Sequence, residues 1–124
     1  MSAWMTSELD ALGGADELTI TTSRPDGTLR GYVPIWVVRV GDEVYVRSYR
    51  GPDGSWFRHA AAQGVAHIRA AGVDRDVAVT AAPSARESVD RAYSTKYARY
   101  GDSYLRPMVT DTAAGTTLRL TPTD

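Results

Sequence analysis

The chain has 124 residues and a mass of 13.4 kDa, the size of one domain with an ordinary hydrophobic core. Its net charge of −1 argues against a nucleic-acid binder, and no apolar run reaches the ~18 residues of a membrane span. The absence of cysteine excludes disulfides and thiolate chemistry and predicts a cytoplasmic location. The segment Met1 to Gly14 lacks the basic start and apolar centre of a signal peptide.

The first third of the chain predicts a short helix over Thr6–Leu12 and a strand over Glu17–Ser23. After a Pro25–Gly27 turn, Thr28–Val40 is expected to form one long extended stretch. Its apolar run Val33–Val38 predicts a strand buried on both faces, the outer one by a second copy of the chain. Within that run, Pro34 cannot donate to a sheet, so a bulge or a sheet edge is expected there.

The central segment predicts a strand and a helix joined by a glycine loop. Glu43–Arg50 alternates cleanly, with Val44 and Val46 facing one side and Tyr45 and Arg47 the other. Gly51 to Gly54 forms the loop, and Ser55 is expected to cap a helix over Trp56–Gln63.

Two strands and the longest helix complete the chain. Val65–Ala71 and Val73–Ala82 are expected as strands around Gly72. A capping box of Ser84 and Glu87 then predicts a helix that ends at Gly101. A last strand follows over Thr116–Thr121. This order predicts one domain over residues 1–124, a small and mostly antiparallel β-barrel with helices at its ends.

The junction between the central strand and helix gathers groups that bind anions. It carries hydroxyl, guanidinium and backbone donors beside a helix N-terminus, which suits a phosphate group. The residues concerned are Arg47, Ser48, Arg50, Gly51, Ser55 and Trp56. The alternative is that the two arginines are solvated charges at a strand end and that Trp56 anchors the core. Of the 14 basic residues only Lys96 is a lysine, so the chain strongly prefers arginine. This preference fits anion recognition, because guanidinium groups bind phosphate and carboxylate with two hydrogen bonds, and it also fits a GC-rich genome.

Four tyrosines form a second cluster. Tyr93, Tyr97 and Tyr100 share a helix face and Tyr104 follows, so they either pack into the core or line a pocket wall. The two histidines, His59 and His67, have no spacing typical of metal ligands, and no metal site is expected.

Five segments together resemble the domain-of-unknown-function family 2255. They are residues 4–12, 24–30, 33–38, 45–51 and 96–100. That family looks like a branch of the flavin-binding split-barrel superfamily, which includes pyridoxamine-phosphate oxidases and deazaflavin-dependent nitroreductases. The resemblance implies a split β-barrel of the FMN-binding type, with a short helix between strands and a long helix before the last strand. It also implies a homodimer with FMN or a deazaflavin held near the subunit boundary.

The resemblance implies roles for individual residues. Ser48, Arg50, Gly51 and Trp56 resemble the phosphate loop of the deazaflavin-dependent branch, and Tyr49 stands where that branch has a lysine. Phosphate binding would therefore depend on Arg47 and Arg50, aided by Ser55. The strand residues Pro34, Ile35 and Trp36 would contact the ring edge. Tyr97 or Tyr100 would act as the catalytic phenol, and Tyr93 and Tyr104 would contact the substrate.

Two functions are consistent with these residues. The first is an oxidoreductase that binds a flavin or deazaflavin and transfers hydride to a small organic substrate. The second is a cofactor-free split barrel that binds a small hydrophobic or anionic ligand, because a fold does not determine its chemistry. Neither function involves a metal, a nucleic acid or a membrane.

Overall fold

The structure, a computed structural model, describes residues 3–123, and seven antiparallel strands of this part form one curled sheet. Its order is β2-β1-β5-β6-β7-β4-β3. The strands are β1 (Leu18–Thr21), β2 (Val33–Ile35), β3 (Val38–Val40), β4 (Glu43–Val46), β5 (Val65–Ala70), β6 (Val73–Ala81) and β7 (Leu118–Pro122). The split β-barrel that the sequence predicts is confirmed.

The two edges of the sheet are consecutive in the chain. β2 forms one edge and β3 the other, and only Trp36 and Val37 lie between them. Pro34 therefore sits on an edge strand, as expected for a residue that lacks an N–H donor. The long extended stretch predicted over Thr28–Val40 is broken into two strands of three residues each.

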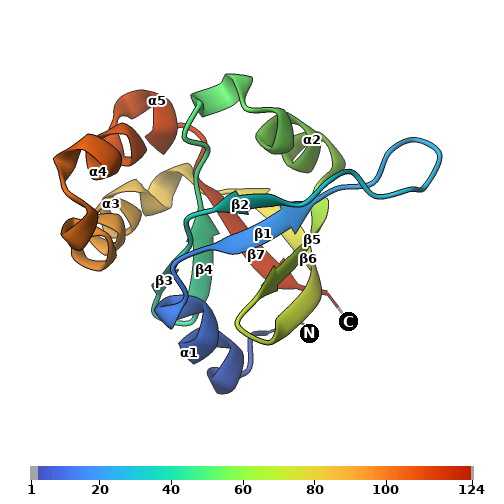
Figure 1. The fold of residues 1–124 in the computed structure, drawn as a ribbon, viewed down its shortest axis with the longest axis horizontal. Helices are drawn as coiled ribbons and strands as arrows, with labels where there is room; N and C mark the ends of the chain where they lie inside the picture. Colours follow the sequence, from blue (N-terminus) through green and yellow to red (C-terminus); the bar gives the residue numbers. More distant parts are fainter. Residues whose placement is uncertain (1–2, 124) are drawn as a thin grey trace.

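Apolar side chains fill the inside of the curled sheet, and helices close its two ends (Figure 1). The helix α1 (Thr6–Gly14) lies at one end and contributes Leu9 and Leu12 to this core. The helix α2 (Ser55–Gln63) lies at the other end and contributes Ala60, with Trp56 and Phe57 packed against the core. The inner face of β4 supplies Val44 and Val46, as its alternation predicts.

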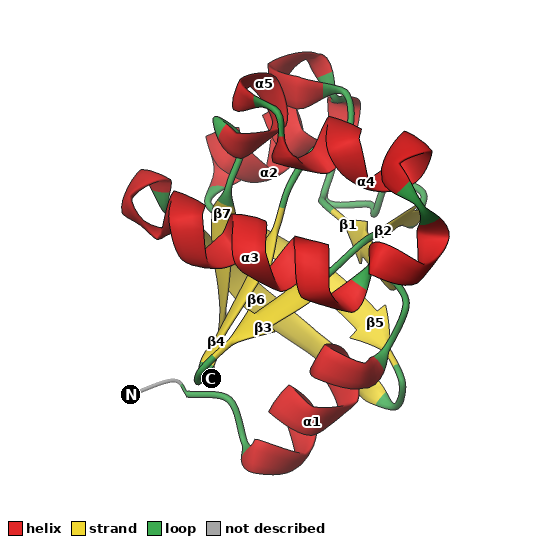
Figure 2. Ribbon diagram, turned by 90° about the vertical axis from the view of Figure 1, so that its left-hand side faces the viewer, coloured by secondary structure: helices red, strands yellow, loops and turns green. Residues whose placement is uncertain are grey.

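A second core lies on the outside of the sheet (Figure 2). Here α3 (Arg86–Lys96) packs on β3, α4 (Asp102–Val109) packs against α3, and α5 (Asp111–Ala114) follows before β7. Val38 and Tyr45 from the sheet pack against Val89, Tyr93 and Tyr97 in this core. The tyrosine stripe therefore serves packing first.

The C-terminal half departs from the prediction at its helices. The predicted long helix ends at Lys96 rather than at Gly101, and a short 3₁₀ helix over Ala98–Tyr100 follows it. The predicted capping box is absent, because Ala85 occupies the N-cap position and no side chain bonds there. Likewise Gly54, not Ser55, is the N-cap of α2. The helices α4 and α5 were not predicted, and Pro107 lies inside α4.

Candidate functional site

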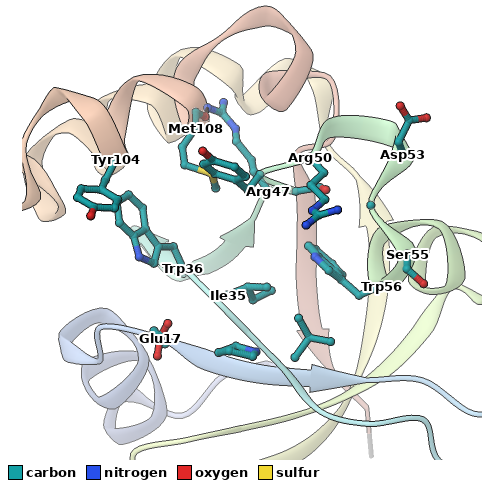
Figure 3. A pocket seen from close by; sticks show the side chains of 15 residues that line it. Glu17, Ile35, Trp36, Arg47, Arg50, Asp53, Ser55, Trp56, Tyr104 and Met108 are labelled. Carbon is teal, nitrogen blue, oxygen red and sulfur yellow. Dashed lines mark hydrogen bonds between the residues drawn. The ribbon is translucent and has the colours of Figure 1, made fainter.

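A cavity of about 530 Å³ opens between β2, the β4–α2 connection and α4, a size typical of small-molecule sites (Figure 3). One part of its wall is apolar and consists of Val33, Pro34, Ile35, Trp36, Trp56 and Met108. The other part carries charged groups, hydroxyls and a glycine, namely Glu17, Arg47, Ser48, Tyr49, Arg50, Asp53, Gly54, Ser55 and Tyr104. The cavity thus offers both a surface for a flat ring and donors for an anion.

The structure gathers most of the expected site residues around this cavity. Those that line it are Pro34, Ile35, Trp36, Arg47, Ser48, Arg50, Ser55, Trp56 and Tyr104. Gly51 lies directly behind them at the start of the 3₁₀ helix Gly51–Asp53. Tyr93, Tyr97 and Tyr100 do not line the cavity.

The β4–α2 connection forms a corner with unused hydrogen-bond donors. The Ser48 hydroxyl is buried and has no partner in the described part of the chain. The helix α2 begins at Ser55 after its N-cap residue Gly54, and no side chain caps its free N–H groups. A Cβ atom on Gly54 would lie 2.3 Å from the Ser48 oxygen, so only glycine allows this close approach. Such a combination of a hydroxyl and helix N–H groups favours an anion.

The loop that forms this corner depends on Gly51. Its φ is +66°, and its N–H donates to the Ser48 carbonyl at 3.0 Å. A Cβ atom there would lie 2.4 Å from the Thr112 methyl group of α5. Gly51 is therefore required for the path of the chain between Ser48 and α2.

The two arginines of the predicted phosphate site have different environments. The Arg47 side chain is buried, and its guanidinium donates to Asp90 at 2.5 Å and to the Met108 carbonyl at 2.9 Å. It also donates to the Thr117 hydroxyl at 2.8 Å. Arg50 is exposed and points into the cavity near Trp56, without an ion pair inside residues 3–123. Arg50 is thus the cation available to a ligand, while Arg47 connects the end of β4 to α3 and α4 through hydrogen bonds.

Tyr97 closes the gap between the two sheet edges. Its hydroxyl accepts from the Val37 N–H at 3.0 Å and donates to the Asp16 carbonyl at 2.7 Å. The neighbouring Lys96 ammonium donates to the Val37 carbonyl at 2.7 Å. These side chains form hydrogen bonds with backbone groups at the gap between β2 and β3, where no neighbouring strand is present to pair with them.

The three helix tyrosines therefore lie behind the cavity wall. Burial raises the pKa of Tyr93 and of Tyr97, so both phenols stay neutral. The Tyr93 hydroxyl is buried and lacks a partner among the described residues. Tyr100 is partly exposed beside Arg99, away from the cavity. Tyr104, which is 65% exposed, is the member of the series that reaches the cavity.

Sequence reasoning missed the lining residues Glu17, Asp53, Gly54 and Met108. Met108 lies one helical turn after Tyr104, and this spacing could have indicated a shared face if α4 had been recognised. Glu17 directly precedes β1 and stands across the cavity from Arg50 (Figure 3). The Asp53 carboxylate points away from the cavity in the same view.

Between residues 3 and 123, no helix is both long and apolar enough to cross a membrane. Nor does the same range hold a cluster of three or more histidine or acidic side chains that could bind a metal ion.

Residues 8–120 match the family described as "Uncharacterized protein conserved in bacteria (DUF2255)". The chain belongs to this family. The match begins within α1, ends within β7 and includes every residue of the cavity wall. No curated protein matches the sequence.

Solved structures share the fold at low sequence identity. An FAD- and heme-binding protein from Mycobacterium smegmatis is 20% identical, with a TM-score of 0.53. The aligned region covers 97% of this chain and 66% of that protein. This chain therefore spans just under two thirds of that protein's length. An F420 reductase is 14% identical with a TM-score of 0.51, covering 93% of this chain and 92% of its own. An FAD-binding protein from Mesorhizobium loti is 14% identical with a TM-score of 0.57, covering 98% of this chain and 92% of its own. At these identities the likeness establishes the split-barrel fold.

Proposed function

We propose that the protein is an oxidoreductase that binds FMN or a deazaflavin in the cavity and acts on a small organic substrate. The observation that carries this proposal is the corner formed by Arg50, the unpartnered Ser48 hydroxyl and the uncapped start of α2. Proteins of the same fold that are described as FAD-binding or as an F420 reductase support it.

The donor set fits the phosphate group of such a cofactor. A guanidinium, a hydroxyl and helix N–H groups are the donors that proteins commonly present to phosphate. Arg50 would provide the charge, with Ser48 and Ser55 beside it, while Gly51 and Gly54 allow the loop to pack closely against Thr112 and Ser48 and so form this corner. The buried Arg47 would act on this site through α4, whose Met108 carbonyl it holds.

The apolar wall fits a flat heteroaromatic ring. Pro34, Ile35 and Trp36 form one side of the cavity, and Trp56 stands beside the phosphate corner. The Trp36 indole is fixed by stacking on the Tyr97 ring, at a centroid distance of 3.8 Å and an angle of 3°. A rigid wall reduces the entropy lost when a ligand is ordered against it.

A bound flavin or deazaflavin would supply the hydride chemistry, and the chain would supply binding and orientation. Tyr104 and Met108 stand on α4 over the open side of the cavity and would contact the substrate. The Tyr104 hydroxyl could orient a polar group of that substrate. Tyr97 and Tyr100 would act indirectly, by holding Trp36 in place.

Absorption spectra of the purified protein and fluorescence titrations with FMN, FAD and F420 test this proposal. We expect one of these cofactors to bind with Kd below roughly 100 μM. Arg50→Ala should weaken that binding about ten- to 150-fold, because it removes a charge-assisted contact to the phosphate. Failure of all three cofactors to bind would overturn the proposal and favour a cofactor-free barrel.

The matched control is Arg58→Ala. Arg58 is an exposed arginine one turn into α2 and does not line the cavity. Like Arg50→Ala, this variant removes one positive charge near α2, but it removes no contact in the cavity. Cofactor affinity should therefore change by about twofold or less. An equal loss in both variants would indicate general electrostatic attraction rather than a phosphate site.

A homodimer forms part of the same proposal. The edge strand β2 leaves Val33 37% exposed, and Pro34 is exposed beside it at the mouth of the cavity. Light scattering at micromolar concentration should give twice the 13.4 kDa chain mass. A Val33→Asp variant should then dissociate, because a charge would be buried at the interface. A monomer in both forms contradicts this part of the proposal.

A further inference from the structure

A second cavity, of about 690 Å³, lies on the other edge of the sheet. The helices α1 and α3 both pack on β3 and leave a groove between them, which we call the α1–α3 groove. Its floor is formed by β3, and its α3 side is formed by Ser88, Arg91, Ala92, Thr95 and Lys96. It shares no lining residue with the candidate cofactor cavity.

Small side chains keep this groove open. Ser88, Ala92 and Thr95 recur at helical spacing on one face of α3, opposite Val38 and Val40 of β3. Larger apolar residues at these positions would cover more of the edge strand, which Val40 leaves partly exposed. The sequence thus leaves a hollow over an apolar floor instead of filling it.

The charges around the groove are predominantly positive. Arg39, Arg91 and Lys96 line it together with a single carboxylate, Asp10. That carboxylate pairs with Arg39 at 2.8 Å. Arg91 is exposed and forms no ion pair with residues 3–123. Among residues 3–123, Arg91 therefore has no carboxylate partner beside the apolar floor, and the Lys96 ammonium is held by backbone carbonyls.

Lys96 has a fixed ammonium at the inner side of the groove. Two of its three N–H groups donate to the carbonyls of Leu12 and Val37, at 3.2 and 2.7 Å. Burial lowers the pKa of Lys96 to about 8, Arg99 acts in the same direction, and Asp16 opposes them. An anion beside this amine would relieve the destabilised charge.

We propose that the α1–α3 groove binds a small organic dianion. Arg91 and Lys96 contact its charged group, Ser88 and Thr95 offer hydroxyls, and the partly exposed side chains of Val40 and Ala92 take its apolar part. The proposal is independent of the cofactor cavity, because the two sites have no residue in common.

The test uses phenyl phosphate as the probe and the full chain carrying Arg50→Ala, so that the cofactor cavity has lost its cation. Amide chemical shifts should move saturably at Arg91 and Ala92 on α3 and at Arg39 and Val40 on β3. Separate titrations use succinate as a dicarboxylate, inorganic phosphate as the charged group without a ring, and phenol as the ring without a charge. Comparing their affinities with that of phenyl phosphate shows whether the groove binds a phosphate, a dicarboxylate, the charge alone or the ring alone. Shifts confined to residues outside the groove would overturn the proposal.

Variants then locate the binding energy. Arg91→Ala should weaken phenyl phosphate about three- to tenfold, the size expected for one partly exposed charge contact. Arg106→Ala removes an exposed arginine of α4, outside the groove, and should leave the affinity unchanged. Ala92→Leu should block the apolar floor and abolish binding of the ring while thermal melting confirms the fold. Equal effects of Arg91→Ala and Arg106→Ala would contradict the proposal.

A second readout follows from Lys96 being the only lysine. A water-soluble acetylating reagent modifies this side-chain amine in one internal peptide, which mass spectrometry quantifies separately from the N-terminal peptide, whose α-amine also reacts. Saturating phenyl phosphate should slow this reaction, since a bound dianion holds the amine protonated and covers it. An unchanged rate alongside saturable amide shifts would place the ligand away from Lys96 and refute the assigned contact.

Discussion

The Trp36 indole lies flat on the Tyr97 ring, with the two planes 3° apart, so the cavity wall and the split in the sheet are built from one pair of residues. One side of this pair reaches the candidate cofactor cavity, and the other side ends at backbone groups of Val37 and Asp16. The position of Trp36 in the cavity therefore depends on hydrogen bonds made behind it.

Tyr97→Phe tests this dependence. The substitution keeps the stacked ring but leaves the buried Val37 N–H without its acceptor, which costs about 1–3 kcal/mol of unfolding free energy. Denaturant unfolding measures this loss. If Tyr97 acts only by positioning Trp36, cofactor affinity should fall along with stability, while turnover of the bound cofactor stays near that of the wild type. A loss of turnover by more than a hundredfold at unchanged affinity and stability, about 2.7 kcal/mol of barrier, would instead indicate a catalytic phenol.

Substitution of Arg47 should lower the stability of the fold, whereas substitution of Arg50 should weaken ligand binding. Arg47→Met leaves the Met108 carbonyl and the Thr117 hydroxyl without their donor and breaks the ion pair to Asp90. We expect a loss of about 2–4 kcal/mol in unfolding free energy. Urea titrations of both variants provide the comparison, because Arg50→Ala, at an exposed position, should change stability by about 0.5 kcal/mol or less. The reverse pattern would assign the anion contact to Arg47.

The contrast between the two arginines shows what the sequence could predict. The alternation in β4 correctly placed Val44 and Val46 in the barrel interior and Tyr45 on the opposite face. It could not show that Arg47, on the same face as Tyr45, is covered. The cover comes from α3 and α4, and Pro107 inside α4 together with the lack of a capping side chain hides that helix from sequence patterns.

The tyrosine stripe shows a second limit. Its helical spacing fits a core face and a pocket wall equally well, and the choice depends on which element lies opposite. The structure places Tyr93 and Tyr97 against Trp36 and Tyr45, so packing determines their position. The sequence could place Ser48, Arg50 and Ser55 in one corner because they lie within a few positions of one helix start, and their role as ligands stays a prediction.

His67 should make stability depend on pH. Its ring donates to Asp76 at 2.6 Å and also contacts Asp74, and these partners, Asp76 foremost, raise the pKa of His67. Its contribution is therefore fully present below the unfolded pKa of about 6.5 and is lost as the pH rises through the higher folded value. Since the group is partly solvated, the change should be about 1 kcal/mol or less.

Urea unfolding between about pH 5 and about pH 9 measures this dependence. His67→Gln should flatten the profile in that range, because glutamine keeps hydrogen-bonding groups but does not titrate. An unchanged slope in the variant would assign the pH dependence to other groups.

Gly54→Ala addresses the anion corner itself. The φ of Gly54 is −61°, so alanine introduces no backbone strain there. The added Cβ atom would lie 2.3 Å from the Ser48 oxygen and must displace it. We expect a loss of about 1 kcal/mol in unfolding free energy, typical of mild overpacking, together with weaker cofactor binding.

The double variant Ser48→Ala with Gly54→Ala separates these two effects. Without the Ser48 oxygen, the nearest atoms to the new Cβ are the Gly51 carbonyl oxygen at 3.4 Å and the Cβ of residue 48 at 3.6 Å. Stability should therefore return to that of the wild type, while binding stays weak because the hydroxyl is gone. Thermal melting and fluorescence titration of the four proteins in this cycle measure both quantities. Recovery of full cofactor affinity in the double variant would show that the Ser48 hydroxyl is not a ligand, and Arg50 with the start of α2 would then account for the anion site.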